Sequence, residues 1–399
     1  MNDFPDRSLR IGTRSSPMAL AQVDLVSALL REHEPELKID VVPVTTEADR
    51  WQGDLAKLGG KGLFVKQIDQ MLQRGQVDMA VHCIKDVPGD QPLPEGLVFA
   101  AYLPRDDVRD VLLVPDSSDR QTLDELPPGA TIATSAVRRK AQILARRPDL
   151  NVVRVRGAVG TRIEKLDGTR PIDHPLDAMV LATSGLERLG ISHRARQVFS
   201  VDDMLPAVGA GALGLECRKD DPAVAGLLSQ LNHDRTMAEI TAERVMLHGL
   251  RGHCNSPIAG HCATEDDGQL SLRGMVFSRD GSKFVHAHFW GESTNDPAAL
   301  GTRVCAELLR QGARDIMRGH PPLRTALRSC SPAGPQCPPS RPSVGIPRFA
   351  PWEAPASLTA FTTDRPGSTS TAAPQPAWSS TAASLGSPDS LPPATPCAR

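Results

Sequence analysis

The segment LRIGTRSSP at residues 9–17 decides the fold prediction for this chain. It begins as a short run rich in strand-forming residues, and it ends with Ser16 and Pro17, a pair that commonly begins a helix. The stretch that follows, residues 17–31, carries apolar residues at helical spacing. A strand that leads through a polar turn into such a helix is typical of an α/β domain.

Short strand-like runs and helical patterns alternate along the first half of the chain. The runs lie at residues 9–12, 38–44, 79–82, 111–114, 131–134, 152–156 and 178–182. This alternation predicts an α/β fold class. Loops around residues 103–107 and 205–207 are suitable crossing points, so we expect two α/β units.

The order of elements changes from about residue 234. A helix at 236–247, strands at 270–277 and 284–290 and a helix at 297–312 predict a smaller α+β domain. Residues 321–399 hold about half of the 35 prolines, are rich in Ser and Ala, and contain no lysine. We therefore predict a disordered tail there. A Pro-rich recognition tail and a reading-frame artefact are the alternatives.

The overall composition narrows the class of protein. With 45 basic and 47 acidic residues among 399, the net charge of −2 argues against a chain that coats nucleic acid or an anionic membrane. No apolar run approaches the roughly 20 residues that span a bilayer, and the polar N-terminus does not resemble a signal peptide. We therefore expect a cytoplasmic protein. The 8 cysteines form no CxxC pair, so neither a zinc site nor a disulfide framework is predicted.

Three turns between a predicted strand and a predicted helix carry arginine. They are residues 12–17, 134–139 and 156–162. Backbone N–H groups at a helix start and the arginine fork both bind anions. Any one of these turns could be a capped helix with a surface arginine, but three in one crevice indicate a ligand with several negative groups. The GxxxxGK[ST] and GxGxxG phosphate patterns are absent from the expected places, so a polycarboxylate fits at least as well as a phosphate.

Three further segments are candidates for chemistry. The glycine-rich loop 56–64 contains two lysines and is either a lid over an anion or a flexible connection. Lys85 and Asp86 end a strand, and form either a structural ion pair or a group that faces the substrate. Cys254 lies in a predicted turn beside His253, as a small buried side chain or as a nucleophile or attachment point.

These segments, in this order and spacing, resemble the hydroxymethylbilane synthase family, also called porphobilinogen deaminase. The resemblance runs from about residue 9 to residue 318. It is carried by LRIGTR (9–14), GGKGLF (59–64), KDVP (85–88), RR (138–139), VGTR (159–162) and LPAVG (205–209).

The resemblance implies an architecture of three domains. Two lobes like those of periplasmic binding proteins would comprise residues 8–104 with 207–230, and 105–206. A smaller α+β domain would comprise residues 231–320, and the tail 321–399 would follow. Cys254 matches the cysteine that holds a dipyrromethane cofactor through a thioether.

The resemblance also implies a reaction. Enzymes of this family condense four porphobilinogen molecules head to tail, release ammonia at each step and free the linear tetrapyrrole hydroxymethylbilane by hydrolysis. Each pyrrole carries an acetate and a propionate, which agrees with the polycarboxylate ligand expected from the arginine turns. No metal, nucleotide, nucleic acid or membrane partner is implied, and the expected state is a monomer.

Individual roles follow from the same resemblance. Asp86 corresponds to the catalytic carboxylate that stabilises the azafulvene cation, with Lys85 and Arg14 beside it. The positions that resemble carboxylate-binding residues are Arg14, Ser16, Lys57, Lys85, Arg138, Arg139, Arg156, Arg162 and Arg188. Thr134 and Ser135 resemble hydroxyl and backbone donors. Gln22, Lys61 and Phe64 resemble residues near the substrate.

The chain departs from the family pattern at several polar positions. Cys83, Ala136, Ala158 and Ala210 stand where the family usually has Ser, Ser, Asn and Gln, and His253 stands where many members have glycine. Each lost hydrogen bond commonly costs about 0.5–1.5 kcal/mol. A degenerate paralogue or a non-catalytic polycarboxylate-binding module is therefore the alternative to a full transferase.

Overall fold

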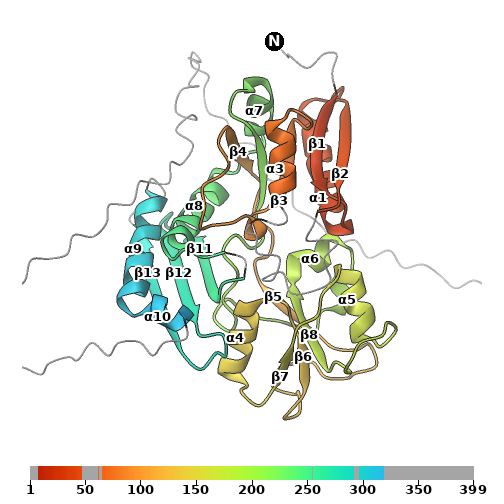
Figure 1. Ribbon diagram of the computed structural model, residues 1–399, viewed down its shortest axis with the longest axis vertical. Coiled ribbons are helices and arrows are strands. Elements are labelled where there is room, and N and C mark those ends of the chain that lie inside the picture. The colour runs from red at the N-terminus through yellow and green to blue at the C-terminus, as the bar shows by residue number, and fades with distance from the viewer. Residues whose placement is uncertain (1–7, 47–61, 63–64, 254, 292–295, 319–399) are drawn as a thin grey trace, which may run out of the picture. The chain divides into compact units, whose positions relative to one another are not determined.

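The computed structural model describes residues 8–46, 62, 65–253, 255–291 and 296–318 (Figure 1). Two five-stranded sheets and one three-stranded sheet organise this part of the chain. Among the described residues, none of the helices has the length and apolar character that crossing a membrane requires. The predicted tail at 321–399 lies outside the described residues.

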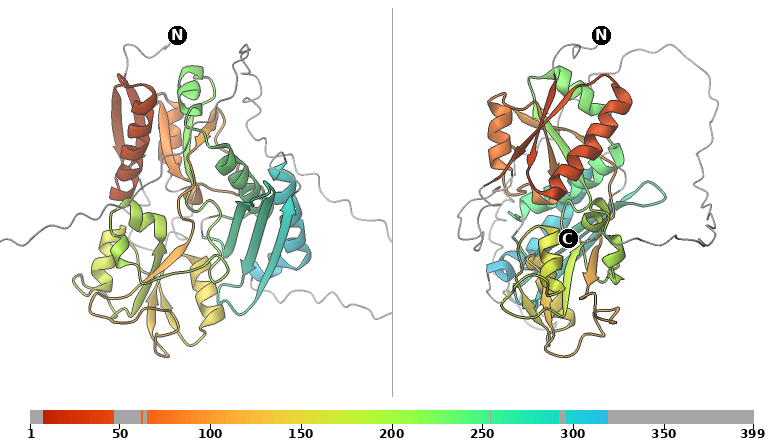
Figure 2. Two further views of the ribbon diagram at one scale, coloured as in Figure 1. Left: turned by 180° about the vertical axis from the view of Figure 1, so that it is seen from behind. Right: turned by 90° about the vertical axis from the view of Figure 1, so that its right-hand side faces the viewer.

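The first sheet has the strand order β2-β1-β3-β10-β4. Its strands are β1 (Leu9–Arg14), β2 (Ile39–Val44), β3 (Met79–Cys83), β4 (Leu97–Tyr102) and β10 (Leu213–Arg218). The first three pair in parallel, and β10 runs antiparallel between β3 and β4. Its helices are α1 (Pro17–His33), α3 (Lys66–Gln73) and α7 (Pro222–Ser229). Figure 2 shows α1 and α3 on opposite sides of this sheet.

The second sheet has the order β7-β6-β8-β5-β9. Its strands are β5 (Asp110–Leu113), β6 (Thr131–Ala133), β7 (Asn151–Val153), β8 (Ala178–Ala182) and β9 (Gln197–Val198). Its helices are α4 (Val137–Arg146), α5 (Val159–Leu166) and α6 (Thr183–Arg188), followed by the short turn η3 (Ser192–Arg194). Apolar residues of α4 pack on one face and those of α5 and α6 on the other, so the sheet lies between helical layers.

The third sheet is an antiparallel meander. Its strands are β11 (Ile258–Thr264), β12 (Leu270–Phe277) and β13 (Phe284–Gly291), and its helices are α8 (Asp234–Gly249), α9 (Pro297–Arg310) and α10 (Ala313–Arg318). Helices α8 and α9 pack together on one face of β12, where alternate residues are apolar (Figure 2). The predicted α/β and α+β fold classes are therefore confirmed.

Several elements were absent from the sequence prediction. These are β4, β9, β10, α3 and α7. Strand β10 is the instructive case, because Gly214 weakens its strand pattern. A Cβ at Gly214 would lie 2.5 Å from Ile84 Cδ1 and 2.9 Å from the Phe99 ring, so close packing between β3 and β4 requires glycine there.

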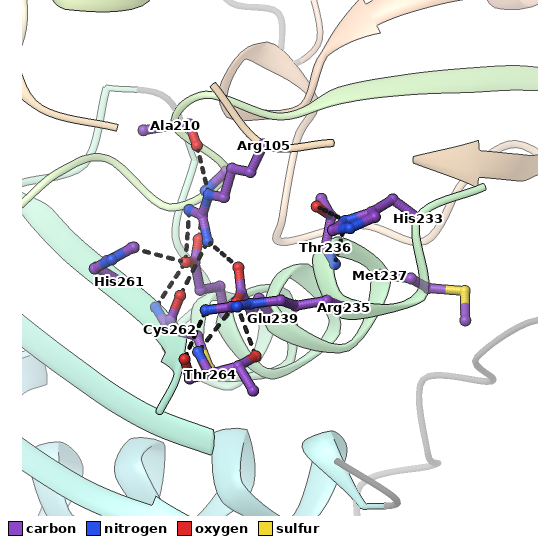
Figure 3. A network of polar contacts seen from close by, with 12 residues as sticks. Arg105, Ala210, His233, Arg235, Thr236, Met237, Glu239, His261, Cys262 and Thr264 are labelled. Carbon is purple, nitrogen blue, oxygen red and sulfur yellow. Dashed lines mark hydrogen bonds and ion pairs between the residues drawn. The ribbon is translucent and has the colours of Figure 1, made fainter. Parts of the chain in front are cut away.

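Two segments connect the first and second sheets and pair with each other. Leu103 N donates to Leu213 O at 3.0 Å, and Asp106 N donates to Gly211 O at 3.0 Å. Arg105 lies between them and reaches α8, where its NH2 group is 2.7 Å from Glu243 Oε1. Arg105 also donates to the carbonyl oxygen of Ala210, as Figure 3 shows. One buried arginine thus joins segments that lead to all three sheets.

Candidate functional site

The first arginine turn begins helix α1 as its sequence predicts. Ser16 is the N-cap residue with an extended backbone, its side chain accepts a hydrogen bond from Ala19 N at 3.3 Å, and proline follows at the first helical position. Arg14 and Ser16 line a cavity of about 60 Å³ together with Gln22, Cys83 and Asp86. Side chains from α1, from β3 and from the turns beside them therefore meet at one cavity.

Lys85 and Asp86 lie in a short 3-10 turn, η2 (Ile84–Asp86), directly after β3. Ile84 is buried, and its N–H group donates to Ala212 O at 3.1 Å. Gly209 supports the same turn from the returning segment, because a Cβ on it would lie 2.8 Å from Lys85 N. The turn is thereby held in place and presents Asp86 to the cavity.

Cys83 joins the two lobes at the edge of this cavity. Its Sγ atom accepts hydrogen bonds from Gln22 Nε2 at 3.0 Å and from Arg188 NH1 at 3.7 Å. Arg188, at the end of α6, also forms an ion pair with Asp106. The thiol therefore takes up contacts that a hydroxyl would make at this position, and the sulfur is a weaker acceptor.

Arg138 and Arg139 in the second turn bind a carboxylate of the protein itself. Both are buried, and they hold Asp110 of β5 at 2.6 Å and 2.7 Å. Burial alone would raise the pKa of Asp110, but the two guanidinium groups lower it well below its usual range. No pattern in the sequence indicates this partner, which lies 28 residues before Arg138. Binding of ligand carboxylates by Arg138 and Arg139 stays a prediction.

The second and third turns begin helices that lack a side-chain cap. Ala136 and Ala158 are the N-cap residues of α4 and α5, and neither makes a side-chain hydrogen bond there. Thr134 Oγ1 accepts from Ala136 N at 3.3 Å, and Ser135 Oγ donates to Val155 O at 3.1 Å. N–H groups in the first turn of each helix thus have no N-cap side chain to compete with an anion.

The pKa of Arg162 depends on charged residues from all three turns. Burial lowers its pKa to about 10, and the positive charges of Arg139, Arg156 and Arg14 add to this effect while Asp86 opposes it. Residues from both lobes therefore lie in one electrostatic environment with a surplus of positive charge. Such a crevice attracts a ligand with several carboxylates.

Helix α8 holds the backbone that follows Asp86. Arg244 NH2 donates to Pro88 O at 2.9 Å, and His248 Nδ1 lies 3.0 Å from Gly89 O. A Cβ on Gly89 would lie 2.4 Å from Leu247 Cδ2, so the chain passes very close to the helix. The sequence analysis missed Arg244 and His248. Their spacing of four residues, which puts them on one helix face, was the available signal.

Four predicted site residues, Lys57, Lys61, Phe64 and Cys254, lie outside the described residues. Helix α8 ends at Gly249 and β11 begins at Ile258, so the helix and the strand predicted on either side of position 254 are both present. The remaining predicted residues lie in or beside the turns that follow β1, β3, β6 and β7, apart from Gln22 within α1 and Arg188 at the end of α6.

Comparison with known proteins identifies relatives over most of the chain. The family model described as "Porphobilinogen deaminase, dipyromethane cofactor binding domain" matches residues 9–226, and "Porphobilinogen deaminase, C-terminal domain" matches residues 237–310. "Porphobilinogen deaminase 2" of Streptomyces coelicolor is 50% identical over 311 residues, which cover 78% of this chain and 96% of that protein. "Porphobilinogen deaminase" of Pelobacter propionicus is 41% identical over 315 residues, 79% of this chain and 97% of that protein.

Solved structures with similar folds are more distant. The periplasmic aliphatic sulphonate binding protein SsuA of Escherichia coli is 16% identical, with a TM-score of 0.34, and the match covers 61% of this chain and 75% of that one. This likeness is too weak to add to the description of the site.

Proposed function

The chain belongs to the porphobilinogen deaminase family, and from this premise we propose which of its residues perform each part of the reaction. The protein is a transferase of tetrapyrrole biosynthesis. It condenses four porphobilinogen molecules stepwise onto a covalently bound dipyrromethane cofactor, releases ammonia and then frees hydroxymethylbilane. The observation that supports our assignment best is the cavity that Arg14 and Asp86 both line. The arginines near it carry enough positive charge to lower the pKa of Arg162.

The described residues fit a dipyrromethane group. Its acetate and propionate carboxylates match the surplus of positive charge and the uncapped starts of α4 and α5. When bound, the group supplies the pyrrole to which the first substrate is joined. We propose that Cys254 holds it as a thioether. The residues that bind its polar groups would be Ser16, Lys57, Lys85, Asp86, Thr134, Ser135, Arg138, Arg139 and Arg156.

Asp86 is the group we propose for the chemical step. Loss of ammonia leaves positive charge on the substrate's pyrrole and methylene carbon, and a carboxylate fixed beside it stabilises that charge. Lys85 and Arg14 would orient the reacting carboxylates, since Arg14 lines the cavity with Asp86 and Lys85 precedes Asp86 in η2. The incoming porphobilinogen would bind to Arg14, Gln22, Lys61, Phe64, Arg156, Arg162 and Arg188.

Replacing Asp86 tests this assignment. Asp86→Asn is expected to leave a folded protein that carries the cofactor but turns over at least 100-fold more slowly, because the amide has no charge to offer. The matched control is Asp220→Asn, an exposed aspartate after β10, which should behave like the wild type. Wild-type turnover by Asp86→Asn in a quantitative product assay would exclude this role.

Intact mass of the denatured protein tests the attachment point. The wild type should exceed the polypeptide mass by two linked pyrrole units, and Cys254→Ser should not. A bare polypeptide mass for folded wild-type protein supplied with porphobilinogen would instead indicate a degenerate paralogue.

We also propose the domain boundaries, oligomeric state and location. The lobes at 8–104 with 207–230 and at 105–206, and the domain at 231–320, are supported by three sheets whose strands fall within these limits. We propose a cytoplasmic monomer that binds no nucleic acid. Light scattering on the purified protein would test the oligomeric state, and a stable dimer would exclude a monomer. Fractionation of cells would test the location.

A further inference from the structure

A buried cluster of three titratable residues lies behind the cavity wall. Asp69 of α3, His82 of β3 and Glu216 of β10 are 7%, 5% and 1% exposed, and one ligating atom of each lies within 4.8 Å of the others. The strand register explains why these three side chains lie close together. Glu216 pairs with Ala80, two residues from His82 and on the same face of the sheet, and α3 covers that face.

The cluster places two carboxylates against one buried imidazole. His82 Nε2 lies 2.9 Å from Glu216 Oε2, the distance of an ion pair, and neither Nε2 nor the other oxygen, Oε1, makes a hydrogen bond of favourable angle among the described residues. Burial and the Glu216 charge raise the pKa of Asp69 to about 7. Burial alone would lower the pKa of His82, but Glu216 and Asp69 raise it above its usual value. The two carboxylates therefore favour the charged form of the imidazole.

His82 is the member of the cluster that reaches the cavity. It lines the cavity with Asp86, which follows it by four residues, and the two side chains interact electrostatically. The ring is fixed from the other side by the edge of Phe99, with ring centroids 6.2 Å apart. A positive charge at this place therefore faces the carboxylate that we assign to the chemical step.

We propose that the carboxylates of Asp69 and Glu216 hold His82 as an imidazolium in the cavity wall, where its charge stabilises the Asp86 carboxylate. The first part, the charged state of His82, is independent of the reaction. The second part rests on the proposed function of Asp86. His82 is a positioning residue in this proposal, because it acts through Asp86.

The surrounding elements support a charged imidazole. The titratable or charged groups that interact with the cluster are Asp69 from α3, Glu216 from β10, Asp86 from η2, Tyr102 from β4 and Arg244 from α8. Burial raises the pKa of Tyr102 to about 12, so this group is neutral at physiological pH. Arg244 balances part of the charge on Glu216, and Asp69 is the member that titrates near neutrality.

A divalent cation is the competing occupant of such a donor set. Two carboxylates and an imidazole are common ligands of such ions. The separation of 2.9 Å between His82 Nε2 and Glu216 Oε2 is that of a direct ion pair. We therefore assign the contact to a charged imidazole, and a metal ion is an outcome that the test must detect.

The first experiment reads the protonation of His82 directly. Nitrogen chemical shifts of the full chain, with labelled histidine, are compared with those of His82→Gln to find the signal among 11 histidines. We expect an imidazolium signal at pH 7 in the wild type, and a smaller imidazolium fraction at the same pH in Glu216→Gln. A neutral His82 at pH 7 in the wild type would overturn the proposal. So would one equivalent of a divalent metal by native mass spectrometry that Glu216→Gln does not retain.

The second experiment reads the pH profile of turnover. His82→Gln should move the acid limb of kcat up by about one pH unit, roughly a tenfold loss on the acid side, with KM little changed. Asp69→Asn mimics the protonated acid and should leave that limb in place. Asp78→Asn is the control, because Asp78 is equally buried in the same sheet but pairs with Arg10.

The outcomes of the two experiments separate the two proposals. An imidazolium at His82 with an unmoved acid limb in His82→Gln would overturn the coupling to Asp86 and leave the cluster standing. Full turnover in Asp86→Asn would remove the proposed function, while the chemical shifts would still decide the charge of His82. If His82→Gln fails to fold, Glu216→Gln serves in its place for both measurements.

Discussion

Gly209 lies against η2, the turn that carries Lys85 and Asp86, and can do so because glycine has no Cβ. Its φ of +77° lies in the left-handed region, and a Cβ would lie 2.8 Å from Lys85 N. Gly209→Ala should therefore lower the free energy of unfolding by about 1–3 kcal/mol and reduce turnover, since Asp86 moves with Lys85. Urea denaturation and a product assay measure the two effects.

The matched control for this prediction is Gly226 in α7. A Cβ there would meet nothing within 4 Å, and the position is helical. Gly226→Ala should raise stability by about 0.5–1 kcal/mol and leave turnover unchanged. Equal losses of turnover in both variants would contradict a specific role for Gly209.

Ala158 offers a prediction of the opposite sign. It is the N-cap of α5 and makes no side-chain cap hydrogen bond. Ala158→Asn should raise the free energy of unfolding by about 1 kcal/mol, because the amide oxygen caps the first turn. Urea denaturation of the full chain checks it. No gain in stability would mean that the first-turn N–H groups are already satisfied.

At the residue scale, the sequence predicted local chemistry and missed partners that are distant along the chain. The Ser16 cap follows from neighbours within a few positions and was predicted correctly. Lys85 and Asp86 were predicted to end a strand, and the structure places them in a short turn directly after it. Asp110 as the partner of Arg138 was not foreseeable, because no local pattern links residues 28 positions apart across a sheet. Such pairings are decided by strand order, which a single sequence does not reveal.

At the element scale, α8 is a helix whose extent the sequence predicted and whose orientation it did not. Its pattern predicted a helix at 236–247, which the structure confirms with slightly wider bounds, Asp234–Gly249. Buried residues surround it on nearly every side, since it packs against the third sheet, against Tyr102 and against the segment after Asp86. A helix buried all round has no single apolar face, so its orientation could not be read from periodicity.

Arg244 on this helix gives a prediction about the segment after Asp86. Arg244→Gln removes the donors to Val87 O and Pro88 O, and should lower kcat at least tenfold with a smaller change in KM. Arg244→Lys should recover part of the loss. Steady-state kinetics measure both parameters. A change confined to KM would show that this segment serves binding and does not position Asp86.

Strand β5 and helix α4 are joined by a buried ion triad with a defined pH dependence. Because Arg138 and Arg139 lower the pKa of Asp110 in the folded state, its contribution to stability is complete above its unfolded pKa of about 4 and is lost as pH falls below that value. Asp110→Asn should cost about 3–5 kcal/mol at pH 7. It should also flatten acid unfolding between pH 4 and 2, followed by circular dichroism. An unchanged acid transition would contradict this contribution.

At the scale of the whole molecule, Arg105 couples the lobes to the third domain (Figure 3). Its guanidinium group pairs with Glu243 and Glu239, and all three side chains are buried. Arg105→Gln leaves Glu243 as a buried charge without its main partner, so we expect a loss of about 3–5 kcal/mol. Calorimetry should also show unfolding split into separate transitions.

Arg235 is the matched control for this coupling. It pairs with the same Glu239 at 3.1 Å, but its side chain is 58% exposed. Arg235→Gln should therefore change stability by at most about 0.5 kcal/mol and keep a single transition. A large effect of Arg235→Gln would mean that charge on α8, and not burial at the crossing segments, determines stability.

The close approach of Gly89 and Gly252 to Leu247 has a consequence for how a product can grow. A Cβ on either glycine would lie less than 2.5 Å from a Leu247 methyl carbon, so the segment after Asp86 and the segment leading toward residue 254 are both mounted on the last turn of α8. With Cys254 as the proposed attachment point and Asp86 as the proposed reacting group, the two ends of the growing chain are held a fixed distance apart. Each added unit lengthens the chain while the distance between its ends stays constant. We therefore expect the oligomer to fold back on itself as it grows, and the space in the crevice to limit the number of units.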